Sequence, residues 1–514
     1  MMTPIALPAL SEAELCRLAE DFAFALKPGD VLALKGDLGA GKTTFARALI
    51  RAVSGSPDIE IPSPTFTLVQ TYGTGRFDIA HFDLYRLTAP EELHELGLDH
   101  ALNKGVAIIE WPERAGDLLP DDQFVVHISE TGDPAARIVI LDATARGAAR
   151  LERLLEIRKF LVASGWGGTD TQLSYLQGDA SPRRYARLKK GDGSIAILMD
   201  APKQPDGPPV RDGLPYSQIA HLAEDVRPFV AVDEALRARG FSAPEIFALD
   251  LANGLLLIED FGDAVFGHEI ELGHDQTTLW RRGVDTLAVL RNAPPPAPMP
   301  LPDGTTYKLP HMDQGSLQIE VELLLDWYWP ALHGSAAPGA AREDFVKLWT
   351  IAFTRIDAAP KGWALRDYHS PNLIVLADRT TPRDTGIIDF QDALLGPHAY
   401  DLVSLLQDAR LDVPGAIEAQ LLAHYIARVR AYDRHFSEDE FRYGYAALGA
   451  QRNTKILGIF ARLAKRDGKT QYLAHVPRIW RYVERNLAHP ELAELKAWYD
   501  SYLPVGMRQR ALKI

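Results

Sequence analysis

The sequence predicts an α/β domain followed by a larger α+β domain built as two lobes. Three observations predict this. A glycine-rich stretch at residues 36–43 lies between an apolar run and an amphipathic segment. Asp367 and Asn372 have an Asp-x₄-Asn spacing just before an apolar run, and Asp389 ends another such run seventeen residues after Asn372. A chain of 514 residues is too long for one hydrophobic core, so two or three domains are expected.

The bulk composition excludes some classes of protein. The net charge of −14 argues against a broad, nonspecific nucleic-acid surface and leaves room only for a local basic patch. The single cysteine, Cys16, excludes an internal disulfide and suits a reducing cytoplasm. Residues 1–10 lack the features of a signal peptide, and no apolar run is long enough to span a bilayer. We therefore expect a cytoplasmic protein without a membrane partner.

Residues 36–43 fit the pattern G-x-x-x-x-G-K-[ST] of a phosphate-binding P-loop. An expected buried strand at 31–34 precedes the pattern and an expected helix at 44–52 follows it. Glycines let successive backbone N–H groups turn toward one anion, and the following helix adds its positive N-terminal end. We expect Lys42 to reach the β- and γ-phosphates of a nucleotide and Thr43 to hold Mg²⁺. The nucleotide-binding residues predicted in this stretch are Gly36, Asp37, Gly39, Ala40, Gly41, Lys42, Thr43 and Thr44.

The remaining segments of the first domain predict the α/β fold of a P-loop NTPase. Ser11 and Glu14 form a capping-box pattern at the start of an expected helix at 11–26. A P-loop enzyme needs an acidic residue at the tip of a neighbouring strand. Glu110, which follows an apolar run, and Asp83 are the two candidates. Further strands are expected at 77–85, 106–109, 124–129 and 137–141, and a short helix at 91–97.

Four motifs in the first domain occur in the same order as in a known family. They occupy residues 36–43, 63–69, 81–87 and 110–113. Together they resemble TsaE, the small bacterial ATPase that supports synthesis of threonylcarbamoyladenosine at position 37 of ANN-decoding tRNAs. The resemblance covers roughly residues 5–145.

This resemblance implies ATP and Mg²⁺ as cofactors, with Lys42, Thr43 and Glu110 as the residues that act on them. It also implies protein partners, the TsaB and TsaD homologues that make the modification, with tRNA engaged only indirectly. The remaining implied roles are switch-like functions for Thr65 and Asp83 and an essential aromatic at Trp111.

The second domain is expected after a charged helix at 148–163 and a glycine-rich composition shift. Asp367 and Asn372 have the spacing of a kinase catalytic loop, in which the aspartate takes the proton of the acceptor hydroxyl and the asparagine binds a metal ion. Asp389 lies where kinases place a Mg²⁺-binding aspartate. Each motif alone is a weak signal, but the pair at this spacing favours a bilobal protein-kinase-like phosphotransferase domain.

These features together predict how the chain is divided. The expected parts are a P-loop domain at 1–148, a helical linker at 149–163, a kinase N-lobe at 164–262 and a C-lobe at 263–514. Helices of the second lobe are expected at 266–292, 317–357, 400–410 and 416–432, with a proline-rich surface loop at 293–310.

A kinase needs further groups upstream of the catalytic loop. Residues 178–185 are a candidate phosphate-covering hairpin, and Met199 stands where the next strand, at 194–199, would carry the kinase lysine. Exposed backbone groups from Glu259 through Asp260 to Phe261, after an apolar strand at 255–258, are expected to pair with adenine.

Two groups of cations are candidates for contacts with phosphate or substrate. A triphosphate needs positive charge, which Arg183, Arg184 or Arg187 could supply; the alternative is a solvated hairpin face. Arg452 and Lys455 belong to a basic concentration that could face an anionic sugar or phosphate, or form a solvated helix face.

Motifs of the second domain resemble the aminoglycoside phosphotransferase and choline kinase superfamily over about 164–505, and within it the anomeric sugar kinases called AmgK. The resemblance implies phosphorylation of N-acetylmuramate or N-acetylglucosamine at C1 in cell-wall recycling. It implies Asp367 as the catalytic base, and we expect His369, Arg452 and Lys455 to contact the sugar. The motifs occupy residues 178–185, 199–202, 366–372, 388–393, 396–397, 400–402 and 451–455.

Three alternatives stay open from the sequence. The acceptor could be an aminoglycoside, choline or an amino-alcohol, each of which is cationic and calls for an acidic pocket. The first domain could act mainly as an accessory ATP-binding module that works through its protein partners. The kinase lobes could have lost activity and only bind nucleotide, although the intact set of Asp367, Asn372 and Asp389 argues against this.

Overall fold

The computed structural model describes residues 3–56, 58–74, 76–176 and 183–513. It forms two compact units. The first comprises Met1–Pro202 with Ile246–Asp260, and the second comprises Lys203–Glu245 with Phe261–Ile514. The strands expected for a kinase N-lobe thus share a unit with the expected P-loop domain. The boundaries near residues 148, 163 and 262 stay predictions.

The first unit is organised around a mixed sheet in the order β1-β8-β7-β3-β6-β5-β4, with β2 pairing β8. Strand β3 pairs in parallel with β6 and β7, and β5 pairs in parallel with β6. All the strands predicted for this domain are confirmed. The strands are β1 (Ile5–Ala6), β2 (Leu10–Ser11), β3 (Val31–Lys35), β4 (Val69–Tyr72), β5 (Asp78–Asp83), β6 (Gly105–Glu110), β7 (Gln123–Glu130) and β8 (Ala136–Ala143).

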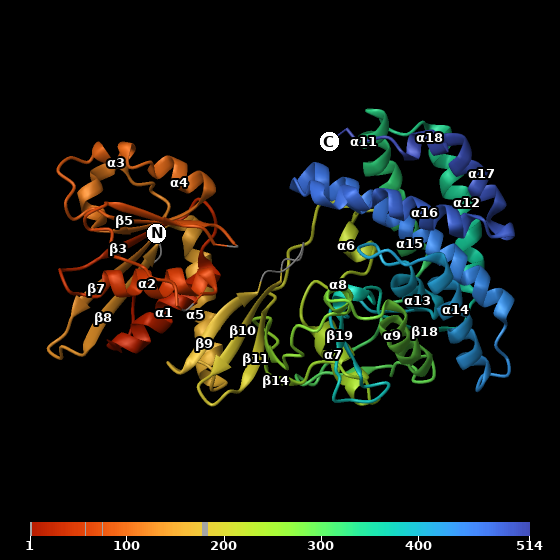
Figure 1. Ribbon diagram of the computed structural model, residues 1–514, viewed down its shortest axis with the longest axis horizontal. Coiled ribbons are helices and arrows are strands. Elements are labelled where there is room, and N and C mark those ends of the chain that lie inside the picture. The colour runs from red at the N-terminus through yellow and green to blue at the C-terminus, as the bar shows by residue number, and fades with distance from the viewer. Residues whose placement is uncertain (1–2, 57, 75, 177–182, 514) are drawn as a thin grey trace. The chain divides into compact units, whose positions relative to one another are not determined.

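Helices cover both faces of this sheet, which gives the predicted α/β fold (Figure 1). On one face lie α1 (Glu12–Ala25), α2 (Lys42–Ser54) and α5 (Ala145–Ala163), packed on alternate strand residues such as Leu32 and Ile108. On the other lie α3 (Glu92–Glu95), α4 (Leu98–Lys104) and the 3₁₀ segment η1 (Pro112–Leu118), packed on residues such as Val31 and Ile109. The capping box of α1 is confirmed, because Ser11 Oγ accepts from Glu14 N while Glu14 accepts from Ser11 N. The predicted helix at 91–97 ends earlier, since Gly97 has φ 78° and separates α3 from α4.

A second, antiparallel sheet in the order β14-β15-β11-β10-β9 completes the first unit. One face of this sheet packs on α5 and on Phe24 of α1. Helix α5 therefore serves two cores, with Leu151 and Leu154 in the core of the first sheet and Ile157 and Leu161 in that of the second. The strands are β9 (Thr171–Leu176), β10 (Arg184–Lys190), β11 (Ile195–Asp200), β14 (Ile246–Asp250) and β15 (Leu255–Ile258).

The second unit is mainly helical (Figure 1). The helix predicted at 266–292 is two helices, α8 (Phe266–Glu271) and α9 (Gln276–Leu290), because the chain turns at Gly273 with φ 96°. The helix predicted at 317–357 is likewise interrupted, at Gly334 with φ 79°. It comprises α10 (Gln314–Leu323), a π-helical segment η2 (Leu324–Tyr328), α11 (Trp329–His333) and α12 (Gly339–Asp357).

The other helices of the second unit include the one predicted at 416–432 and the one predicted at 400–410, which ends earlier, at Leu406. They are α6 (Tyr216–Ile219), α7 (Arg227–Arg237), α13 (Ala399–Leu406), α14 (Gly415–Arg430), α15 (Glu438–Asp467), α16 (Val476–Leu487), α17 (Ala493–Tyr502) and α18 (Val505–Arg508), with the 3₁₀ segments η3 (Ser370–Asn372), η4 (Thr470–His475) and η5 (Pro490–Leu492).

Short strands form four antiparallel pairs in the second unit, one of them inside the predicted proline-rich loop. They are β12 (Pro209–Arg211) with β13 (Leu214–Pro215), β16 (Met299–Pro300) with β17 (Thr306–Tyr307), β18 (Lys361–Ala364) with β21 (Leu394–Pro397), and β19 (Leu373–Val375) with β20 (Thr385–Ile387).

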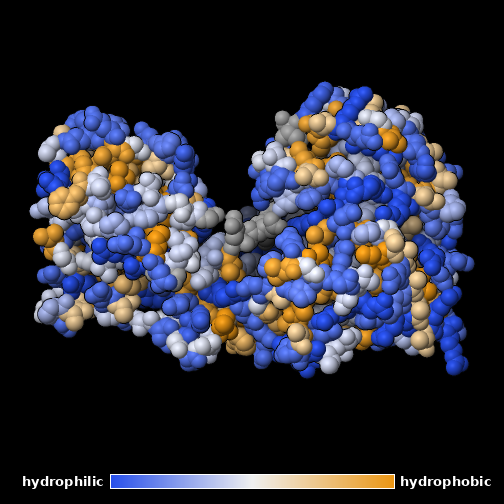
Figure 2. All heavy atoms as spheres, in the orientation of Figure 1, coloured by the Kyte–Doolittle hydropathy of each residue, from blue (hydrophilic) through white to orange (hydrophobic). Residues whose placement is uncertain are grey.

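Hydrophilic side chains dominate the visible face of each unit, and hydrophobic ones form small patches (Figure 2). Within the described ranges, every helix is too short or too polar to cross a lipid bilayer.

Candidate active sites

The glycine-rich loop of the first unit joins β3 to α2 and closes around the side chain of Lys42. Gly36 has φ 142°, and a Cβ there would lie 2.1 Å from the Ile128 carbonyl oxygen, so only glycine fits. Lys42 Nζ donates to the carbonyls of Gly36 at 2.7 Å and Asp37 at 2.8 Å, and lies 3.7 Å from the centroid of the Trp111 ring. Burial lowers the pKa of Lys42, while the Glu110 carboxylate opposes that shift. The loop thus holds a cation where a phosphate-binding loop needs one.

Glu110 contacts the first turn of α2. Thr43 Oγ1 donates to Glu110 Oε2 at 2.9 Å, and the other carboxylate oxygen lies 2.9 Å from His81 Nε2. The parallel pairing of β3 with β6 and of β6 with β5 brings these residues to one edge of the sheet. A hydroxyl and a carboxylate are hard oxygen ligands, so Thr43 and Glu110 fit Mg²⁺. Sequence reasoning missed His81, although its place two residues before Asp83 on one strand is a signal for it.

Asp83, the other acidic candidate, has a different partner. Its carboxylate accepts from Thr65 Oγ1 at 2.6 Å and from the backbone N–H of Tyr85 at 3.0 Å. Asp83 thereby fixes the loop at 63–68, and Glu110 is the acid that meets Thr43. Direct roles of Asp83 and Trp111 in nucleotide binding stay predictions.

The other predicted loop residues have different surroundings. Gly39 and Gly41 have φ 82° and 112°. The buried Ala40 accepts from Arg137 Nε through its carbonyl. Thr44 lines a separate hollow with Cys16.

The arginines of the second sheet have two different environments. Arg184 pairs with Asp200 and donates to the carbonyl of Phe24, on the sheet face that α5 covers. Arg187 points to the opposite face and pairs with Asp260, with Nε 2.5 Å from Oδ2. Arg184 therefore has a structural role at the covered face, and Arg187 is paired with Asp260 on the other face. The phosphate contacts predicted for these arginines stay predictions.

The remaining residues predicted for this sheet give little further evidence for a nucleotide site. Met199 is buried between its strand neighbours Tyr185 and Leu256. Arg183 and Glu259 are half-buried, and their nucleotide contacts stay predictions. The predicted hairpin at 178–185 falls largely on residues 177–182, which lie outside the described residues.

In the second unit, buried carboxylates hold the backbone of the predicted catalytic loop. Asp401 of α13 accepts from the N–H groups of Leu365 at 2.7 Å and Arg366 at 2.9 Å. Asp408 accepts from the N–H of Ser370 at 2.8 Å. Burial raises the pKa of Asp401 to about 7, against the effect of its two backbone donors. Asp367, the predicted base, thus lies on a backbone fixed on both sides.

Asn372 links the base to the predicted metal-binding aspartate. Its Nδ2 donates to the Asp367 carbonyl at 3.0 Å and to Asp389 Oδ2 at 3.3 Å. Gln391 Nε2 donates to Asp389 Oδ1 at 2.8 Å, a contact that sequence reasoning missed. The amide oxygen of Asn372 and the Asp389 carboxylate suit Mg²⁺. The structure brings Asp367, Asn372 and Asp389 together as predicted, and their ligand roles stay predictions.

The described part of the chain holds no cluster of three or more His, Cys, Asp or Glu arranged for a metal ion. Mg²⁺ in nucleotide sites takes one or two carboxylates and completes its octahedron with waters and phosphate oxygens. Both oxygen pairs described above fit that pattern.

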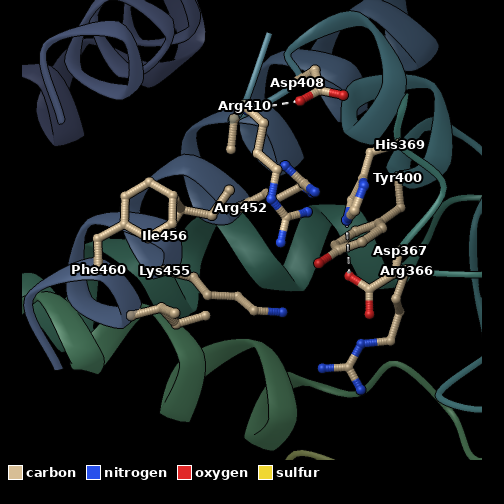
Figure 3. A pocket seen from close by; sticks show the side chains of 12 residues that line it. Arg366, Asp367, His369, Tyr400, Asp408, Arg410, Arg452, Lys455, Ile456 and Phe460 are labelled. Atoms are coloured by element: carbon tan, nitrogen blue, oxygen red, sulfur yellow. Dashed lines mark hydrogen bonds and ion pairs between the residues drawn. The ribbon is translucent and has the colours of Figure 1, made fainter. Parts of the chain in front are cut away.

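Asp367 faces a cavity of about 150 Å³ (Figure 3). Arg366, Asp367 and His369 form one side, and Arg452 and Lys455 of α15 form the opposite side. The Asp367 side chain keeps 41% of its exposure, which suits a base that must reach a substrate. Further lining residues are Tyr400, Asp408, Ala409, Arg410, Ile456, Ile459 and Phe460.

Charges around this cavity keep Asp367 ionised. Burial raises the pKa of Asp367, but His369, Lys455 and the arginines Arg366 and Arg452 outweigh it, so the net shift is downward. Burial lowers the pKa of His369, against the opposing effect of the Asp408 and Asp367 carboxylates, and His369 Nε2 lies 3.8 Å from Asp367 Oδ1. Sequence reasoning placed His369, Arg452 and Lys455 near the substrate, and all three line this cavity.

Lys455 and Arg366 share a buried acid that sequence reasoning missed. Lys455 Nζ lies 2.7 Å from Glu320 Oε1, and Arg366 pairs with the same carboxylate. Gln451 Nε2 donates to the second oxygen of Glu320 at 2.9 Å. Glu320 lies on α10, far from α15 in sequence, so no local pattern could identify it.

Comparison with known proteins identifies both halves of the chain. Residues 9–139 match the family model described as threonylcarbamoyl adenosine biosynthesis protein TsaE, and residues 172–436 match the one described as phosphotransferase enzyme family. An N-acetylmuramate/N-acetylglucosamine kinase of Caulobacter vibrioides is 40% identical over 359 residues, which cover 68% of this chain and 96% of that kinase. A tRNA threonylcarbamoyladenosine biosynthesis protein TsaE of Rickettsia conorii is 40% identical over 178 residues, or 35% of this chain and 97% of that protein. The solved Plasmodium vivax ethanolamine kinase is 9% identical, with a TM-score of 0.41 over 61% of this chain and 82% of that one.

Proposed function

The chain belongs to the phosphotransferase enzyme family and, through its first domain, to the TsaE family, and on this basis we propose a protein with two activities in the cytoplasm. Its C-terminal kinase transfers the γ-phosphoryl group of ATP to the C1 hydroxyl of N-acetylmuramate or N-acetylglucosamine, in cell-wall recycling. Its N-terminal ATPase supports threonylcarbamoyladenosine formation at position 37 of tRNA.

The observation that carries the kinase proposal is the hydrogen-bonded set of Asp367, Asn372 and Asp389 beside the cavity that Arg452 and Lys455 close. The Asp367 carboxylate accepts the proton of the C1 hydroxyl, and the freed oxygen attacks the γ-phosphorus in line. The bond from that phosphorus to the bridging oxygen of ADP breaks. An anomeric hydroxyl is more acidic than an ordinary alcohol, so a base of low pKa is strong enough. Mg²⁺, held by Asn372 and Asp389 when bound, neutralises charge on the phosphates.

The charge of the cavity supports a sugar acceptor over a cationic one. Its lining includes four cationic side chains and two carboxylates, of which Asp408 is taken up by backbone N–H groups. An aminoglycoside or choline would bring further positive charge to this wall, which like charges disfavour. A neutral or anionic acceptor meets no such penalty.

For the first domain, the proposal rests on Lys42, Thr43 and Glu110. Lys42 Nζ donates to two carbonyl oxygens, which a phosphate group would replace as its partners. The Glu110 carboxylate accepts from the Thr43 hydroxyl, and both groups would bind Mg²⁺. We expect its ATP-bound form to engage TsaB and TsaD homologues, with tRNA contacted indirectly. Capture of purified TsaB–TsaD by the unaltered chain with ATP, and loss of capture for Lys42→Ala, tests this; equal capture by both chains would contradict it.

An acceptor panel with labelled ATP tests the kinase proposal. The panel contains N-acetylmuramate, N-acetylglucosamine, an aminoglycoside and choline, and phosphorus NMR locates the phosphate on the product. We expect turnover of the two acetylated sugars with the phosphate on C1. Turnover of the cationic acceptors alone, phosphate on another hydroxyl, or no turnover would overturn the proposal.

A further inference from the structure

We propose that the Arg452 guanidinium binds the carboxylate of an acidic sugar and so sets the kinase's preference for N-acetylmuramate over N-acetylglucosamine. This inference rests on the proposed function and adds to it a residue that determines specificity. The two sugars share the acetylated amino-sugar ring. They differ in the lactyl ether of N-acetylmuramate, which carries a carboxylate.

Arg452 is a buried cation that lacks an anion. It keeps 5% of its exposure, and its Nη1 is buried with no hydrogen-bond partner in the described part of the chain. A buried charged donor without a partner is costly, because it has lost water and gained nothing in return. Such a group on the wall of a cavity indicates that its partner comes with the ligand.

The acids of the cavity are committed to other groups. Asp408 accepts from the backbone N–H of Ser370, Arg410 and Leu411. Asp367 faces the reacting hydroxyl in the proposed mechanism. Neither carboxylate forms an ion pair with Arg452 among the described residues. The positive charge of Arg452 does help to lower the pKa of Asp367.

The neighbouring cations are committed as well. Lys455 is one turn from Arg452 on α15, and its Nζ lies 2.7 Å from Glu320. Arg366 pairs with the same Glu320 and donates to the carbonyl of Ala220 at 2.9 Å. Arg452 therefore differs from both, because no carboxylate among the described residues forms an ion pair with its guanidinium.

The geometry of the acceptor suits this contact. Arg452 and Asp367 line one cavity from opposite sides (Figure 3). When Asp367 takes the C1 proton, the lactyl group on C3 lies two ring carbons away, within the same cavity. A guanidinium can meet a carboxylate with two parallel N–H···O bonds, which an ammonium cannot do.

The experiment measures kcat/KM for both sugars with the unaltered protein, Arg452→Gln and Arg452→Lys. We expect the ratio of N-acetylmuramate to N-acetylglucosamine to fall by about tenfold or more in Arg452→Gln, chiefly through KM, since a hydrogen bond to a charged group is lost. Arg452→Lys keeps the charge but not the fork and should give an intermediate ratio. Arg481→Gln, on α16 with a side chain 55% exposed and outside the cavity, is the matched control and should leave the ratio unchanged.

A second arm uses the unaltered protein and is independent of folding. The methyl ester of N-acetylmuramate keeps the ether but has no carboxylate, and we expect its kcat/KM to fall to near that of N-acetylglucosamine. An ester as good as the acid would overturn the inference.

Arg452 could instead contact the transferred phosphoryl group, which is also anionic. Arg452→Gln would then slow both sugars by the same factor and leave the ratio unchanged, which also overturns the inference. Failure of the unaltered protein on both sugars would overturn the proposed function itself, so the two failures are distinguishable.

Discussion

Arg153 of α5 donates to Asp200 at the end of β11, with Nη2 2.7 Å and Nε 3.1 Å from Oδ1. Asp200 is fully buried and also pairs with Arg184 of β10. A cation–π contact also joins Arg76 to Tyr175, with the guanidinium 4.0 Å from the ring centroid. The sheet of the kinase part and the P-loop domain are thus joined by buried charge and a shared helix, and not only by the chain.

Asp200→Ala should destabilise this junction. It leaves Arg153 and Arg184 without their shared acid, and removing one partner of a buried ion pair costs about 3–5 kcal/mol. Thermal and urea unfolding of the full chain would measure the change. The control is Arg146→Ala, also on α5, whose side chain is 85% exposed and which should change stability by no more than about 0.5 kcal/mol. An equal effect of the two substitutions would mean that the buried pair contributes nothing.

Removing α5 should expose the apolar face that it covers. A chain of residues 164–514 loses Ile157 and Leu161, which pack on Leu188, Leu198 and Leu257. We expect it to bind a hydrophobic dye and to be cleaved rapidly by protease, because large exposed apolar patches promote association. A chain of residues 145–514 keeps α5 and is the matched comparison. Similar dye binding and cleavage of the two chains would show that α5 is dispensable to this sheet.

The parts of the fold that the sequence could predict are those set by local patterns. Lys42 and Thr43 follow from one loop motif, and Glu110 follows from an apolar run that ends beside it, because parallel strands bring their carboxyl ends to one edge. Asp367 and Asn372 likewise follow from a fixed spacing. These predictions depend on interactions between residues that are close in the sequence or lie on adjacent strands.

The parts that the sequence could not predict depend on distant segments. Glu320 meets Lys455 across 135 positions, and no spacing rule links them. The sequence of helix α5 predicts only a charged linker, because its apolar residues are divided between two cores. Neither face of the helix alone therefore shows a clear apolar stripe. The break at Gly273 was missed because apolar periodicity continues on both sides of it, and only a positive φ ends the helix.

The two active sites should respond independently to substitution. Asp367→Ala removes the proton acceptor and should lower sugar phosphorylation by about 10²–10⁴-fold, while nucleotide binding at the P-loop is retained. Lys42→Ala should do the reverse. Sugar turnover is measured with labelled ATP, and P-loop binding is the part of fluorescent-nucleotide binding that Lys42→Ala removes. Unimpaired sugar turnover by Asp367→Ala would refute its assignment as the base.

Trp111 should report nucleotide binding at the P-loop. Lys42 Nζ lies 3.7 Å from its ring centroid and is held by two carbonyls that phosphate would replace. Movement of the cation toward phosphate changes the field at the indole, so ATP should alter tryptophan emission. The signal is the difference between the unaltered chain and Trp111→Phe, which removes the contribution of the other tryptophans. The same ATP response in both chains would place its origin elsewhere.

Removing the charge of Lys455 should move the acid limb of the kinase's pH–activity profile to higher pH. Burial favours the neutral form of Asp367, and the cations around it, Lys455 among them, reverse that effect and hold the pKa below its usual range. A base works only when ionised, so activity is lost as the pH falls through its pKa. Lys455→Met removes one of the compensating positive charges, so the pKa of Asp367 rises. The loss of activity on acidification then begins at a higher pH.

The measurement is kcat/KM against pH for the unaltered chain, Lys455→Met and Lys455→Arg. The arginine variant keeps the charge toward Asp367 and Glu320, so its acid limb should stay near that of the unaltered chain. If Lys455 only supports the packing of α15, the methionine variant would lose activity by one factor at every pH. A shift of the acid limb would show the electrostatic role, because a loss of packing lowers activity by an amount that does not depend on whether Asp367 is ionised.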